Sequence, residues 1–329
     1  MKKFTNNIFL FLFIAAYPIA AVQQNYDPLS LPKNFKAEIV DLTVHEIARQ
    51  REIPVRVYLP PANTPAPVIL FSHGLGGSRE GNIYLGEHWS ARGYICVFIQ
   101  HPGSDESVWK DKPKLLRLAA MRKAASLENF MLRVKDVSVV IDKLEEWNKS
   151  VDHSFMGRFD LGRIGMSGHS FGAVTTQAVS GEVFQNGKIS VTDKRIKAAI
   201  AMSPSSSKKE NNPKTKFGNV KIPWMLMTGT KDVAVIGDQD VESRLLVFPN
   251  LPSGSKYEIV LYNAEHSAFS DRALPGDKEE KNPNHHRVIL ALSTAFWDAF
   301  LKENKSAVEW LNGSSPSSAI EKNDRWQLK

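Results

Sequence analysis

The chain has 329 residues, of which 42% are hydrophobic and 23% are charged. This ordinary globular composition excludes collagen-like, coiled-coil and largely disordered chains, and the length suits one large α/β domain or about two smaller ones. The 42 Lys and Arg side chains exceed the 35 Asp and Glu by a net charge of +7. That surplus does not by itself indicate a nucleic-acid partner, and the sequence carries no nucleic-acid-binding motif. A single cysteine, Cys96, excludes an intrachain disulfide framework and a cysteine-based metal site.

Residues 1–21 have the pattern of a secretory signal peptide. Two lysines precede an apolar stretch from Ile8 to Ala16, and small residues follow near Ala21. The stretch is shorter than the ~20 residues that span a bilayer, which favours a cleaved signal over a membrane anchor. We therefore expect cleavage near Ala21 and a periplasmic or secreted protein.

Strand and helix patterns then alternate along the chain. An antiparallel hairpin at a sheet edge is expected within 43–59, followed by a stiff proline-rich connector. Buried strands are expected at 68–71, 94–99, 163–167, 198–202, 224–227 and 257–261, and helices at 84–92, 128–147 and 286–301. Such alternation predicts a mostly parallel central sheet flanked by helices.

We expect one domain over 22–311, with a small helical insertion at 106–127. Residues 312–329 are rich in Ser, Asn, Lys and Glu and are expected to form a flexible tail. Arg133 and Asp136 lie three apart on the helix 128–147, and we expect them to pair with each other.

The strongest local motif is Gly168-His-Ser-Phe-Gly172, where the strand 163–167 meets a helical stretch. A serine hydroxyl is a weak nucleophile unless a base takes its proton. It must also project clear of the backbone so that a substrate can reach it. A sharp strand-to-helix turn presents the hydroxyl but crowds the residues two before and two after it, where glycine relieves the crowding. The motif predicts that Ser170 is a nucleophile; the alternative is a glycine-rich turn around a buried serine.

A glycine-rich loop, Phe71-Ser-His-Gly-Leu-Gly-Gly77, follows a buried strand upstream. Its glycines let the backbone turn so that the N–H of Leu75 faces the reaction centre, and the N–H of Phe171 supplies a second donor. Two such donors form an oxyanion hole. We interpret His73 as a residue that hydrogen-bonds within this loop.

Two further polar residues follow strands downstream. Asp232 comes after the strand 224–227, and His266 comes after the strand 257–261. Active sites of open α/β sheets collect at the carboxyl ends of strands. The order Ser170, Asp232, His266 is the order expected for an α/β-hydrolase triad, in which the histidine takes the serine proton and the aspartate holds the imidazole.

Other candidates for these roles are weaker. Asp238 and Asp240 lie in the same loop as Asp232 but further from the strand end. His169 is too close to reach around to Ser170, and Glu265 is expected to be solvated. His285 and His286 open the last helix and are expected at the surface. Because HExxH, paired-carboxylate and phosphate-loop motifs are lacking from the sequence, we expect no metal and no cofactor.

The segments Phe71-Ser-His-Gly-Leu-Gly76, Gly168-His-Ser-Phe-Gly-Ala173 and Ala264-Glu-His-Ser-Ala-Phe269 together resemble the α/β-hydrolase superfamily. Within it they are similar to platelet-activating-factor acetylhydrolases, predicted dienelactone hydrolases and cutinase-like polyester hydrolases, from about residue 40 to 301. The resemblance implies the α/β-hydrolase fold and cofactor-free hydrolysis of carboxylic esters through an acyl-enzyme.

The chain departs from this pattern in two places. Dienelactone hydrolases have cysteine where Ser170 stands. Acetylhydrolases take their acid from the strand end directly after the elbow helix, but that stretch here, 201–207, has serine in its place. The acid would then come from the next strand, as in cutinase-like enzymes, which again selects Asp232.

Two segments border the expected pocket. His101 and Asp105 follow the strand 94–99 and either line the pocket or fix its loop, while Phe269 is expected to add apolar surface. The segment 106–127 is basic with interleaved apolar residues. One interpretation is functional: the segment forms a lid or makes a weak contact with a membrane or anionic surface. The other is structural: it is a solvated helix that shields the sheet.

The expected function is a serine carboxylic-ester hydrolase that acts on short to medium acyl esters. Its substrate partner would be a small-molecule or polymeric ester, with polyesters and acetylated lipids included. A peptidase or acyltransferase on the same triad, and a non-catalytic binding protein of the same fold, are the alternatives.

Overall fold

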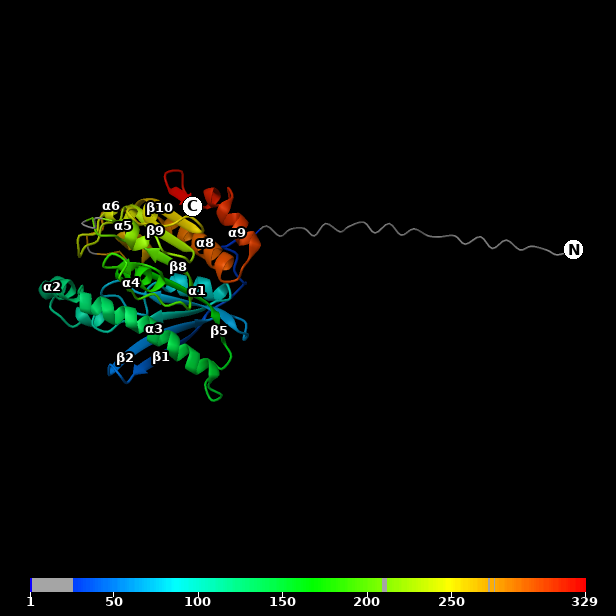
Figure 1. Ribbon diagram of the computed structural model, residues 1–329, viewed down its shortest axis with the longest axis horizontal. Helices are drawn as coiled ribbons and strands as arrows, with labels where there is room; N and C mark the ends of the chain where they lie inside the picture. Colours follow the sequence, from blue (N-terminus) through cyan, green and yellow to red (C-terminus); the bar gives the residue numbers. More distant parts are fainter. Residues whose placement is uncertain (2–25, 209–211, 272, 275) are drawn as a thin grey trace.

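The computed structural model describes residues 1, 26–208, 212–271, 273–274 and 276–329 (Figure 1). Apart from Met1, the expected signal peptide lies outside these residues. Within the described ranges, no helix combines the length and the apolar character needed to cross a membrane.

A nine-stranded sheet forms the centre of the molecule, in the order β1-β2-β4-β3-β5-β8-β9-β10-β11. Its strands are β1 (Glu38–Glu46), β2 (Arg51–Leu59), β3 (Ala66–Ser72), β4 (Ile95–Ile99), β5 (Phe159–His169), β8 (Ile196–Met202), β9 (Trp224–Lys231), β10 (Lys256–Glu265) and β11 (Arg325–Leu328). The strands from β4 to β10 in this order are parallel neighbours, while β1, β2 and β11 join by antiparallel pairing. The predicted mostly parallel sheet with an edge hairpin is confirmed. A separate two-stranded sheet joins β6 (Val183–Phe184) to β7 (Ile189–Ser190).

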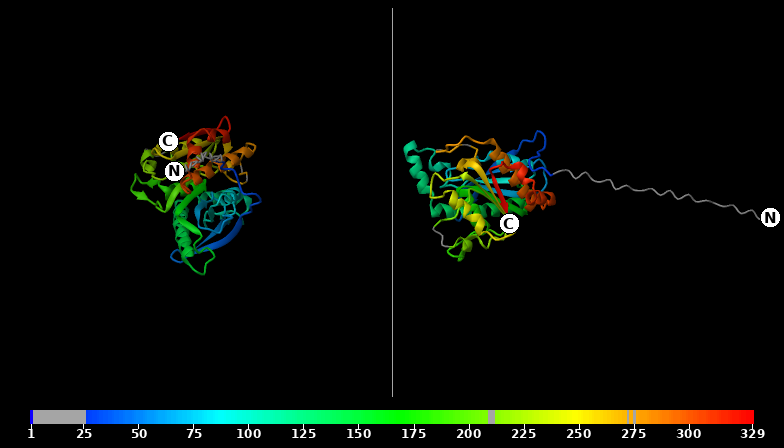
Figure 2. Two further views of the ribbon diagram at one scale, coloured as in Figure 1. Left: turned by 90° about the vertical axis from the view of Figure 1, so that its right-hand side faces the viewer. Right: turned by 90° about the horizontal axis from the view of Figure 1, so that it is seen from above.

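Helices cover both faces of the large sheet (Figures 1 and 2). The longer ones are α1 (Ile83–Ala91), α2 (Lys114–Ala124), α3 (Leu127–Lys149), α4 (Phe171–Ser180), α8 (Pro283–Phe300) and α9 (Lys305–Asn312). The short ones are η1 (Glu106–Val108), α5 (Pro213–Phe217), α6 (Val241–Leu245), α7 (Val247–Asn250), η2 (His266–Phe269) and α10 (Pro316–Ala319).

The core has two main layers because alternate side chains of a strand point to opposite faces. In β3, Ile69 and Phe71 pack in one cluster with α1 and α8, whereas Val68 and Leu70 pack in another with α3 and α4. Burial on both faces explains why the central strands are continuous apolar runs.

The parallel strands bring their carboxyl ends to one edge of the sheet. β3 ends at Ser72, β5 at His169, β9 at Lys231 and β10 at Glu265. The segments that carry the predicted site residues all begin at this edge.

The prediction of a flexible tail at 312–329 was wrong. This segment contains α10 and then β11, which pairs antiparallel with β10 in the register Ile259↔Trp326. The ring of Trp326 stacks on that of Tyr257, with centroids 5.7 Å apart. A strand of four residues is too short to show an alternating pattern of apolar side chains. The prediction therefore rested on the polar composition of the segment, which indicated a tail.

The contact between β11 and β10 predicts a position-specific loss of stability. Trp326→Ala removes the stacked ring, and we expect the free energy of unfolding to fall by about 2 kcal/mol, roughly half the loss for a fully buried aromatic. Leu328→Ala, on the same strand but 44% exposed, should change it by less than about 0.5 kcal/mol. Urea unfolding measures both, and equal losses would contradict this role for Trp326.

Candidate active site

Ser170 occupies the turn between β5 and α4, with a backbone φ of 59° that non-glycine residues rarely adopt. A Cβ atom at Gly172 would lie 1.8 Å from the carbonyl oxygen of Ser72, and one at Gly168 would lie 2.4 Å from that of Gly172. Only glycine fits at either position. The crowding expected from the sequence is confirmed, and the half-buried Ser170 hydroxyl stands clear of it.

The structure brings the three predicted side chains together. Ser170 Oγ lies 2.8 Å from His266 Nε2, and His266 Nδ1 lies 2.7 Å from Asp232 Oδ1. Because Nδ1 faces a carboxylate, it carries the ring proton, which leaves Nε2 to accept the serine hydroxyl. The hydroxyl of Thr228 donates to the other oxygen of the buried Asp232, at 2.9 Å.

The alternative acids do not reach His266. Asp240 accepts the N–H of Ser243 at the start of α6 and pairs with Lys208. Asp238 is exposed in the same loop. The strand-end position of Asp232 therefore decides which carboxylate meets the imidazole.

A buried arginine beside this acid was not foreseen from the sequence. Arg244 of α6 places its Nε 3.3 Å from Asp232 Oδ1 and donates to the carbonyl oxygen of Ser203 at 2.9 Å. Burial alone would raise the pKa of Asp232, but the charge of Arg244 and the interaction with His266 outweigh it and hold that pKa below its ordinary value. Arg244 Nη2 also lies 3.4 Å from His266 Nδ1, a nitrogen that already donates to Asp232.

His169 packs against His266, with ring centroids 4.7 Å apart. Its Nε2–H donates to the carbonyl oxygen of His266 at 3.0 Å. Burial, together with a smaller contribution from the neighbouring His266, lowers the pKa of His169 to about 3, so this ring is neutral near pH 7. It supports the backbone of His266 without competing for the serine proton.

The loop 73–77 lies directly against the serine. A Cβ at Gly74 would lie 3.3 Å from that of Ser170. The N–H of Phe171 begins α4 and has no acceptor within that helix. Within the described residues, the N–H of Leu75 also has no acceptor. Both predicted oxyanion donors are available to a ligand oxygen.

Arg133 of α3 binds this loop and the residues around it through its guanidinium. Its buried guanidinium donates to the His73 carbonyl and to the hydroxyls of Ser72, Ser104 and Thr175. Burial lowers the pKa of Arg133 to about 9, so the side chain stays charged at neutral pH. The predicted pairing of Arg133 with Asp136 was wrong, because Asp136 pairs instead with Arg49 and Arg51 of the β1–β2 hairpin.

A second series of serine, histidine and aspartate contacts lies at the base of this loop and joins Ser72, His101 and Asp136. Ser72 Oγ lies 2.9 Å from His101 Nε2, and His101 Nδ1 lies 3.0 Å from Asp136 Oδ2. All three side chains are 0% exposed. Burial, together with the charge of Arg133, lowers the pKa of His101 to about 4. Of the two roles considered for His101, the structure supports fixing the loop.

The remaining predicted residues are structural. His73 donates from Nδ1 to the carbonyl oxygen of Gly74, as expected, and accepts the N–H of His101 on Nε2. Asp105 is buried and accepts from Gln100, so it also fixes its loop. Phe269 was expected at the pocket, but it is 0% exposed and packs in the core.

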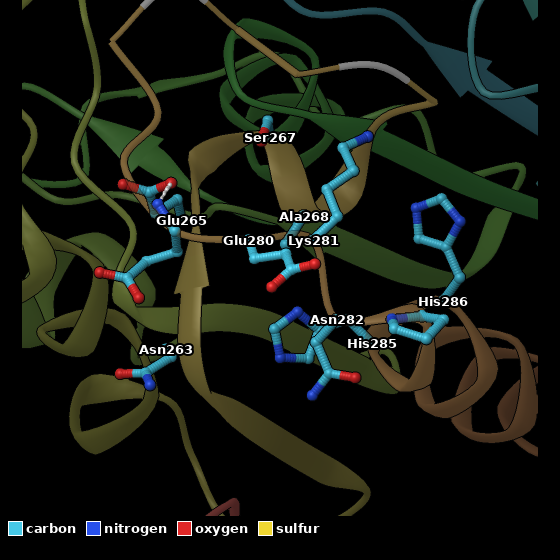
Figure 3. Close-up of a pocket in the computed structure, with 11 residues that line it drawn as sticks. Asn263, Glu265, Ser267, Ala268, Glu280, Lys281, Asn282, His285 and His286 are labelled. Atoms are coloured by element: carbon cyan, nitrogen blue, oxygen red, sulfur yellow. Dashed lines mark hydrogen bonds between the residues drawn. The ribbon is translucent and has the colours of Figure 1, made fainter.

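Figure 3 shows a pocket of about 230 Å³ between the end of β10, η2 and the start of α8. Its lining includes Glu265 and His285 but none of the triad. Glu265 accepts the N–H groups of Lys278 and Glu279, so it orders the loop before α8. Across the described part of the chain, no three His, Cys, Asp or Glu residues form a group that could hold a metal ion.

The buried histidines predict acid sensitivity. The folded-state pKa values of His101 and His169 fall from 6.5 to about 4 and about 3, chiefly through burial. The unfolded chain therefore binds protons more readily, and the free energy of unfolding should decrease as the pH falls from 6.5 toward 4. Urea titrations across this range should show a shallower decrease for His101→Asn, whose amide can still donate to Asp136. An unchanged pH dependence would contradict a neutral, buried His101.

A scan against protein-family models gives no match for the chain, and a search of curated proteins finds none with significant similarity.

Proposed function

We propose that this chain is a serine hydrolase of carboxylic esters built on the α/β-hydrolase fold. The observation that carries the proposal is the contact series from the Ser170 hydroxyl through His266 to the ionised Asp232. The fold assignment is supported by the mostly parallel sheet and by the serine at a strand-to-helix turn.

The acylation step follows from these contacts. Ser170 Oγ attacks the ester carbonyl carbon while its proton passes to His266 Nε2. The carbonyl oxygen becomes negative and accepts hydrogen bonds from the N–H groups of Leu75 and Phe171. When the bond to the alcohol oxygen breaks, His266 returns the proton to that oxygen, which leaves an acyl group on the serine.

Hydrolysis of the acyl-enzyme repeats the same proton movements. A water molecule takes the place of the alcohol, gives one proton to His266 Nε2 and bonds to the acyl carbon. The proton then returns to Ser170 Oγ as the carboxylic acid leaves. Arg244 keeps Asp232 ionised throughout, so the imidazolium formed twice in the cycle always faces a negative charge.

Active-site labelling tests the nucleophile directly. We expect a fluorophosphonate probe to modify Ser170, and Ser170→Ala to lower kcat on p-nitrophenyl acetate or butyrate by roughly 10⁴-fold or more. Ser72 provides the internal comparison, since it has the same kind of partners but is fully buried. Mass spectrometry of the labelled peptides should find the probe on Ser170 alone.

Three outcomes would contradict the proposal: label on Ser72, wild-type turnover in Ser170→Ala, or a folded protein that hydrolyses no ester. Faster cleavage of amide substrates would indicate a peptidase, and transfer to an added alcohol that outruns hydrolysis would indicate an acyltransferase. A panel of esters from acetyl to palmitoyl, with one polyester film, should show the highest rates at short to medium chains.

The role of Arg244 makes a second prediction. Removing its guanidinium should raise the pKa of Asp232 and take away the ion pair and the Ser203 contact that hold this acid beside His266. We therefore expect kcat for Arg244→Gln to fall by about tenfold or more, because a displaced orienting group costs at least that much. Arg244→Lys keeps the charge and should retain more activity. KM for a short soluble ester should change little, since the contacts of Arg244 are with the acid and nearby backbone. Equal kcat in the two variants would contradict a charge-dependent role.

A further inference from the structure

The segment 106–127, which follows β4 and contains η1 and α2, lies at the periphery of the molecule. Figures 1 and 2 show α2 projecting beyond the rest of the fold at the edge where the parallel strands end. Three of its side chains are strongly exposed: Leu115 at 95%, Leu116 at 56% and Leu118 at 42%. Surface helices usually turn their apolar face to the core, so this orientation is reversed.

The opposite face of α2 attaches the helix to the loop 73–77. Trp109, just before the helix, donates from Nε1 to the carbonyl oxygen of Gly76 at 2.8 Å. A Cβ at Gly76 would lie 2.6 Å from the sulfur of Met121. Arg117 covers the Trp109 ring at 5.3 Å from its centroid. The exposed leucines are therefore fixed relative to the oxyanion donor Leu75, which precedes Gly76.

The same segment carries a surplus of positive charge. Residues 106–127 include six Lys and Arg side chains but only two Asp and Glu. Lys110 pairs with Glu106. Within the described part of the chain, no ion pair uses the remaining lysines or the arginine near the helix end, which are Lys112, Lys114, Lys123 and Arg122.

Leucines that protrude between unpaired cations fit a lipid surface with anionic headgroups. Apolar side chains of such a helix enter the acyl boundary, while lysines and arginines meet the headgroup phosphates. The projecting shape favours a bilayer over a protein groove. The loop that begins at Asp232 extends the apolar character of this sheet edge, because Val233 and Val235 are 52% and 50% exposed.

We propose that α2 docks the protein on anionic lipid surfaces, with Leu115, Leu116 and Leu118 inserted and the neighbouring cations on the headgroups. Docking would turn the sheet edge that carries Ser170 toward the surface. Resting on the function proposed above, this gives the site esters that are held in or on such a surface, in addition to esters in solution.

Vesicle co-sedimentation of the full chain tests the docking without using activity. We expect binding to vesicles of mixed phosphatidylcholine and phosphatidylglycerol, weak binding to phosphatidylcholine alone, and a decrease with added salt. Leu115→Glu combined with Leu118→Glu should lower the partition coefficient by about tenfold or more. Lys112→Glu with Lys114→Glu should abolish the preference for anionic vesicles.

Val151→Glu is the matched control. Val151 is 75% exposed but follows α3 at the opposite edge of the sheet. This variant should bind vesicles like the wild type. All variants should hydrolyse a soluble p-nitrophenyl ester at the wild-type rate, so loss of docking is distinguishable from failure of the proposed esterase function.

Four results would overturn the proposal. These are equal binding to both vesicle types, wild-type binding by the leucine double variant, equal loss in Val151→Glu, and no vesicle binding by the wild type. A wild-type dimer in light scattering that the leucine double variant converts to monomer would assign the helix face to a second copy of the chain instead.

Discussion

The close approach of α4 to the end of β3 is the constraint on which the sheet edge depends. The Ser72 carbonyl occupies the space that any side chain at Gly172 would need. This contact forces the chain to turn sharply at Ser170 and brings the first N–H of α4 beside the loop that leaves β3. One packing contact therefore sets both the direction of the hydroxyl and the position of two backbone donors.

Two buried arginines support this edge. Arg133 binds the carbonyl of His73 and the hydroxyl of Ser72, so it fixes the strand end and the loop together. Arg244 lies against Asp232 and the backbone after β8. Burying a cation costs free energy unless its donors are paired. Here the donors pair with the strand end and loop at residues 72–73 and with Asp232, which together position the site. Several supports of the site are charged hydrogen bonds in the core, which are stronger than neutral ones.

The sequence was sufficient for those parts of the site that local pattern determines. Ser170, Asp232 and His266 each follow a recognisable buried strand, and the topology of a parallel sheet brings strand ends together. The arginines could not be predicted in the same way, because Arg133 looks like any polar position of an amphipathic helix. Its partners come from other elements, and the expected partner Asp136 is taken by the hairpin arginines. β11 was missed for a related reason: its stability comes from pairing with β10 rather than from its own residues.

Two sets of serine, histidine and aspartate lie at this edge with nearly the same contacts, so distance alone does not decide which is reactive. Ser72 accepts a hydrogen bond from Arg133, and a substrate carbonyl has no path to it. Its histidine is held neutral by burial beside a cation, which disfavours the imidazolium that proton transfer must form. Ser170 is instead half-buried, and among the described residues the N–H of Leu75 has no acceptor while that of Phe171 has none within its helix. If Ser170 is the nucleophile, as proposed above, the two sets differ in the surroundings of the serine: access for the substrate and N–H donors for the oxyanion.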